Sequence, residues 1–70
     1  MASGAVIREL TAAVERSPDA VELRLHLADL LLQNGSYAAA LVHCSAVLSH
    51  DASNSAALSL LHRCSAGLAP

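Results

Sequence analysis

The sequence predicts a small all-α domain, and three observations carry this prediction. Ala and Leu are the commonest residues, with 15 and 13 copies among 70, whereas Gly and Pro together total five. Apolar residues recur at intervals of three and four in four successive segments, which is the spacing of one helix face. No segment alternates apolar and polar residues as a half-buried strand does. We therefore expect residues 1–70 to form one domain of four antiparallel helices.

The first helix is expected over about residues 4–16. Its apolar face consists of Val6, Leu10, Ala13 and Val14. Ser3 can cap its start. Pro18 ends it, because a proline disfavours helical backbone in the residue before it.

The second helix is expected over about residues 20–33. Asp19 followed by Glu22 resembles a capping box, and Asn34-Gly35 is a typical C-terminal cap. Its apolar residues cover two faces: Leu23, Leu27, Leu30 and Leu31 on one, and Val21, Leu25, Ala28 and Leu32 on the other. A helix this apolar must be packed on two sides, so we expect it at the centre of the domain.

The third helix is expected over about residues 36–49, with Ser36 as its cap. Its buried face is predicted to be Tyr37, Ala40, Leu41, Cys44, Val47 and Leu48. His43 and His50 lie off that face, where solvent is their expected neighbour.

The fourth helix is expected over about residues 54–66, capped by Ser53 and ended by Gly67. Its apolar face is predicted to be Leu58, Leu61 and Cys64, with weaker contributions from Ala57 and Leu68. Residues 67–70 are interpreted as the start of a linker.

A repeat appears in the spacing of the helix boundaries. Ser17-Pro18-Asp19 and Asp51-Ala52-Ser53 lie 34 residues apart, and each ends one helix and precedes the next. Residues 21–54 resemble one tetratricopeptide repeat through Leu27-Ala28, Leu31, Gly35-Ser36-Tyr37, Ala40-Leu41, Cys44, Val47 and Leu48. The resemblance implies helical hairpins arranged as a half repeat, one full repeat and another half repeat. It also implies that Ala28 and Ala40 let two helices approach closely.

One polar stripe on the second helix is the best candidate for a binding surface. Its members are Glu22, His26, Asp29 and Gln33. The resemblance implies that the first helices of successive repeats line a concave groove that holds a peptide, which adds Ser59 and Arg63 from the fourth helix. This mildly acidic surface suits a protein partner, a peptide or helix with basic and apolar groups. The alternative interpretation of the same residues is a solvated helix face.

The family's clamp for a C-terminal carboxylate needs Lys and Asn in this groove. Leu25 and Asp29 stand at the first two corresponding positions, so the resemblance does not extend to binding chaperone C-terminal tails.

Composition argues against other classes of function. The formal net charge is −2 and Lys is absent, so no basic surface is available for nucleic acid. The four His and two Cys lack the tight pairs of a structural zinc site, and we expect no metal or other cofactor. No nucleophile is placed beside an acid–base pair, so we expect no enzyme activity of its own. The prediction is a docking module or adaptor.

The location expected for the chain is the cytoplasm. No apolar run approaches the length of a membrane span, and Arg8 and Glu9 interrupt what would be the apolar part of a secretory signal. Cys44 and Cys64 are then reduced, and both lie on apolar faces as core residues. A disulfide between them requires that the third and fourth helices bring them together.

The sequence is also compatible with two other functions. The fourth helix, 54–66, carries Arg63 as its only full charge, which favours self-association in an oligomerisation module. Small domains of this kind also precede larger modules, so the chain can be the N-terminal regulatory or substrate-recruiting domain of an enzyme such as an AAA-type ATPase.

Overall fold

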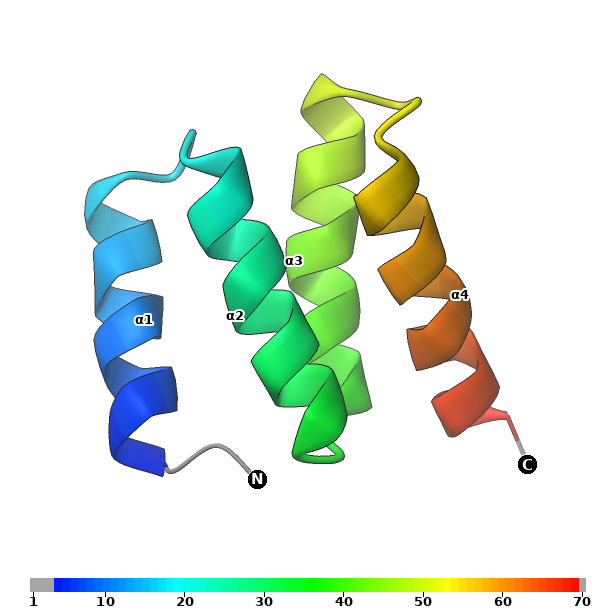
Figure 1. The fold of residues 1–70 in the computed structure, drawn as a ribbon, viewed down its shortest axis with the longest axis horizontal. Helices are drawn as coiled ribbons and strands as arrows, with labels where there is room; N and C mark the ends of the chain where they lie inside the picture. The colour runs from blue at the N-terminus through cyan, green and yellow to red at the C-terminus, as the bar shows by residue number, and fades with distance from the viewer. Residues whose placement is uncertain (1–3, 70) are drawn as a thin grey trace.

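Four antiparallel helices make up the domain (Figure 1). The computed structural model describes residues 4–69. The helices are α1 (Gly4–Arg16), α2 (Val21–Gln33), α3 (Tyr37–His50) and α4 (Ser55–Leu68). The described residues contain no strand, so the all-α prediction is confirmed.

Each helix packs on its neighbours in the chain, and α2 also contacts α4. The α2–α4 contact skips one helix, so α2 and α4 share one layer and α3 lies behind them. The Cα atoms span 30 × 27 × 14 Å, which fits two thin helical layers. The predicted half, full and half hairpins are therefore confirmed, with α2 and α3 as the complete repeat.

The core is built mainly from α2, α3 and α4, with Val14 added from α1, and holds no charged or polar side chain among the described residues. Its largest fully buried side chains are Leu27, Val47, Cys44 and Cys64. Three fully buried alanines lie between the helices: Ala28, Ala40 and Ala57. Because their side chains are small, the helix backbones approach closely at these points, as the repeat resemblance implied.

The outer helices bury only part of their predicted apolar faces: Val14, Ala57 and Cys64 are buried as predicted, whereas other members are exposed. In α4 the buried residues are Ala57, Leu60 and Cys64, whereas Leu58 and Leu68 are 45% and 50% exposed. In α1, Val6 is exposed and Ile7 packs against the core. Both helices have apolar residues at more positions than one face can hold. Their orientation therefore depends on the helices they pack against, which periodicity does not specify.

The predicted end of α2 at Asn34-Gly35 is confirmed. The Gly35 amide donates to the Leu32 carbonyl at 3.1 Å, and the Ser36 amide donates to the Leu31 carbonyl at 2.8 Å. These two bonds define a Schellman motif. Gly35 has φ +80°, a conformation that a residue with a Cβ adopts at a cost of about 1 kcal/mol or more.

Two predicted caps are wrong. Ala20 occupies the cap position of α2 with no side-chain hydrogen bond, so Asp19 does not form a capping box. Asn54, not Ser53, caps α4, and its Oδ1 accepts from the Ala57 amide at 2.9 Å. Ser53 bonds to Asp51 instead. Each loop holds several residues able to cap, and backbone geometry selects among them.

Ser36 occupies the predicted cap position of α3, but its side chain makes no cap hydrogen bond. The Ser3 cap proposed for α1 lies outside the described residues.

The fourth helix continues past its predicted end. Gly67 lies inside α4, which runs to Leu68, so the interpretation of residues 67 and 68 as linker is wrong. A Cβ at Gly67 would lie 2.6 Å from Cε1 of Tyr37. Here glycine allows the aromatic ring at the start of α3 to lie against the last turn of α4, and this contact holds the end of α4 on the domain.

Candidate functional site

An open groove of roughly 430 Å³ runs between α2 and α4 on the face away from α3. Eight residues line it: Glu22, Leu25, His26 and Asp29 from α2, and Ala56, Ser59, Leu60 and Arg63 from α4. Leu25 and Leu60 belong to the core and are each 8% exposed, so they form an apolar floor. The polar residues form the two walls.

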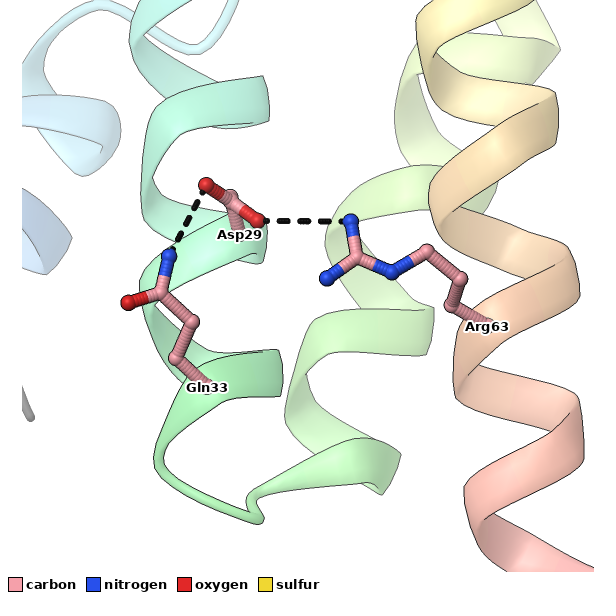
Figure 2. Close-up of polar contacts among 3 residues, drawn as sticks. All are labelled: Asp29, Gln33 and Arg63. Atoms are coloured by element: carbon pink, nitrogen blue, oxygen red, sulfur yellow. Dashed lines mark hydrogen bonds and ion pairs between the residues drawn. The ribbon is translucent and has the colours of Figure 1, made fainter.

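An ion pair crosses the groove and joins its two helices (Figure 2). Nη1 of Arg63 lies 3.7 Å from Oδ1 of Asp29, and Nε2 of Gln33 donates to Oδ2 of Asp29 at 3.1 Å. The Arg63 and Asp29 side chains are 55% and 38% exposed. A pair this exposed contributes at most about 1 kcal/mol to stability, so its main effect is to orient the two side chains.

The other end of the groove carries unused polar groups. Within residues 4–69, Glu22 and His26 take part in no ion pair and no side-chain hydrogen bond. Both side chains are exposed. The groove holds two carboxylates and one guanidinium, which gives one net negative charge when His26 is neutral. The uncompensated charge is therefore that of Glu22.

The structure brings the six predicted site residues to one face. Glu22, His26, Asp29, Ser59 and Arg63 line the groove, and the sixth, Gln33, bonds to Asp29 from the next turn. The family resemblance also placed Leu25 in this groove, at a clamp position, and the structure finds it there. Sequence reasoning missed Leu60 and Ala56, because their place in the groove depends on how α4 packs against α2.

A second, smaller cavity of about 240 Å³ lies where the α1–α2 loop meets the end of α3. It is lined by Pro18, Asp19, Val21, Arg24, Val47 and His50. Its mostly apolar wall and small size suit a single side chain better than a whole ligand.

Arg24 connects the α1–α2 loop to α3 through its guanidinium group. Its Nη2 donates to the Pro18 carbonyl at 3.1 Å, and its Nη1 lies 3.4 Å from Nδ1 of His43. His43 is half-buried, so the prediction that solvent surrounds it is wrong. An arginine donates only, so Nδ1 of His43 must accept and the ring is neutral. Burial, and then the charge of Arg24, hold the pKa of His43 below its usual 6.5.

Acidification is expected to lower the free energy of unfolding as the pH falls below about 6.5. The pKa of His43 is lower in the folded domain than in the unfolded chain. In that pH range the unfolded chain therefore binds more protons at His43, and a fall in pH favours unfolding. Well above pH 6.5 His43 is neutral in both states, and its effect on stability is absent. Urea unfolding at a series of pH values measures this dependence.

His43→Gln, which cannot titrate, is expected to show a weaker loss of stability on acidification than the unsubstituted domain. His62→Gln is the matched control, because His62 is exposed on α4. Equal pH dependence in the unsubstituted domain and His43→Gln would contradict the assignment.

Neither a metal cluster nor a membrane-spanning helix is found in the part of the chain that the structure describes. Among residues 4–69, no three His, Cys, Asp or Glu side chains are grouped to hold a metal ion. No helix there is long and apolar enough to cross a membrane.

Comparison with protein families gives a match over most of the chain. A family model described as tetratricopeptide repeat matches residues 3–64. No curated protein and no solved structure matches the chain.

Proposed function

Because the chain belongs to the tetratricopeptide repeat family, we propose that it is a docking module that binds a partner's peptide or helix in the groove between α2 and α4. Repeats of this family mediate protein–protein interaction and are generally not catalytic. The observation that carries the proposal is the groove itself, which combines an apolar floor with walls that hold a net negative charge.

The groove chemistry defines the kind of partner. Leu25 and Leu60 offer apolar surface to a leucine-sized side chain, and Glu22 offers a carboxylate to an arginine or lysine one helical turn away. Arg63 and Asp29 already satisfy each other, so they contribute shape and orientation more than free charge. A short amphipathic segment with alternating basic and apolar positions fits this arrangement.

A displayed library of random peptides tests the proposal. We expect selection on the domain to enrich peptides that carry both Arg or Lys and Leu-like residues. In Glu22→Lys the affinity of a selected peptide should fall by about tenfold, because reversal of the charge converts an attraction into a repulsion. Fluorescence anisotropy with the labelled peptide measures the change.

Glu9→Lys is the matched control, because Glu9 is also exposed and makes the same charge change on α1, outside the groove. It should bind the peptide as the unsubstituted domain does. Equal losses in both variants would indicate a response to net charge alone and would contradict binding in the groove. Amide shift changes in nuclear magnetic resonance spectra that avoid Glu22, Ser59 and Arg63 would also contradict it.

A second candidate function is self-association through α4. It is supported by Leu58 and Leu68, which are large apolar side chains exposed on that helix. This surface carries no carboxylate, so it differs from the groove in chemistry as well as in position. Self-association would be insensitive to Glu22→Lys, which separates the two candidates.

A further inference from the structure

Two cysteine side chains meet in the core between α3 and α4. Cys44 and Cys64 are both fully buried and belong to the same core cluster. They lie on helices that pack directly against each other, and the neighbouring Cys64 side chain adds to the effect of burial in raising the pKa of the Cys44 thiol. The fully buried alanines Ala40 and Ala57 lie on the same two helices and allow the close approach. The structure therefore meets the condition that the sequence set for a disulfide.

We propose that Cys44 and Cys64 form an intramolecular disulfide when the domain meets a small-molecule disulfide such as oxidised glutathione. Both are free thiols in the structure. Two buried thiols on helices that pack against each other can bond with less movement than cysteines in distant parts of a fold. The inference does not depend on the proposed docking function.

The reaction is two steps of thiol–disulfide exchange. One cysteine thiolate attacks a sulfur of the small disulfide, which forms a mixed disulfide and releases one small thiolate. The second cysteine, once deprotonated, attacks the protein sulfur of the mixed disulfide and releases the second small thiolate. The two cysteines lose two protons and two electrons, and the small disulfide is reduced to two thiols.

Burial makes this reaction conditional on movement of the helices. It raises the pKa of the Cys44 thiol to about 11, with a further contribution from neighbouring Cys64. At pH 7 only about one Cys44 thiol in 10⁴ is then ionised in the closed domain. Exchange therefore proceeds when α4 separates from α3, and the new bond holds the two helices together after they close.

The disulfide would make the structure of the groove depend on the redox state of its surroundings. α4 supplies one wall of the groove, and Arg63 of that wall is adjacent in sequence to Cys64. A covalent link from Cys64 to α3 would fix this wall against the rest of the domain.

Trypsin gives a direct test, because the chain has no Lys and Arg63 immediately precedes Cys64. The folded domain is incubated with oxidised glutathione without denaturant and is then digested without reduction. We expect peptides 25–63 and 64–70 to remain joined in one species that reductant separates. The intact protein should be a monomer with no free thiol and no glutathione adduct.

The disulfide should also lower the equilibrium constant for unfolding, on the order of 100-fold. The reason is that the disulfide closes a loop of about 20 residues and so reduces the conformational entropy of the unfolded chain. Cys44→Ala and Cys64→Ala should each give only a mixed disulfide with glutathione. Persistence of two free thiols after prolonged incubation would overturn the proposal. So would dimers or glutathione adducts as the sole products, or a linked form less stable than the reduced domain.

Discussion

Replacement of Leu27 by alanine is expected to remove a large part of the domain's free energy of unfolding. Leu27 is fully buried in α2, the helix that contacts all three others. Loss of a buried leucine side chain costs roughly 2–5 kcal/mol, because apolar burial is lost and a cavity remains. A domain of 70 residues has a total stability of only about 4–10 kcal/mol. One substitution therefore removes a large part of it.

Circular dichroism during thermal and urea unfolding measures this effect. Leu58→Ala is the matched control, since it removes the same atoms from a residue that is 45% exposed on α4. The control should change the free energy of unfolding by less than about 1 kcal/mol. Similar stabilities for the two variants would show that Leu27 is not the centre of the core.

The second large effect is expected for Ala40→Leu. Ala40 is fully buried in α3, in the close-packed complete repeat. A leucine there has no space, so it forces α3 away from its neighbours at a cost of about 1–3 kcal/mol. The free energy of unfolding should fall even though the substitution adds apolar surface.

Ala38→Leu separates overpacking from a general effect of leucine in this helix. Ala38 is two residues earlier in α3 and is exposed. Leucine and alanine both favour helix, so this variant should keep nearly the original stability in urea unfolding. A stable Ala40→Leu variant would mean that α3 is packed more loosely than the fully buried Ala40 indicates.

The central hairpin could be predicted from the sequence because several signals agree there. Asn34-Gly35 marks the turn, the alanines mark the close contact, and the apolar pattern of α2 requires partners on both sides. All of these depend on residues near one another in the chain. These local signals predict the hairpin independently of how the other helices pack.

Predictions failed where the choice depends on a distant partner. Leu58, Leu60 and Leu61 are all candidates for the buried face of α4, and only its contacts with α2 and α3 select Leu60. His43 is near Arg24 because α2 and α3 are antiparallel, which the spacing within α3 does not reveal. The polar stripe of the groove was predictable as a helix face, whereas its apolar floor required knowledge of how α2 and α4 meet.

The order of contacts along the chain has a kinetic consequence. Among the described helices, every packed pair is adjacent in the chain except α2 with α4. Such a topology closes only short loops, and chains of this type fold in microseconds to milliseconds. Because α1 packs on α2 alone, it is the helix that can detach and return without disturbing the others. The groove between α2 and α4 would persist through that fluctuation, since α1 contributes no residue to it.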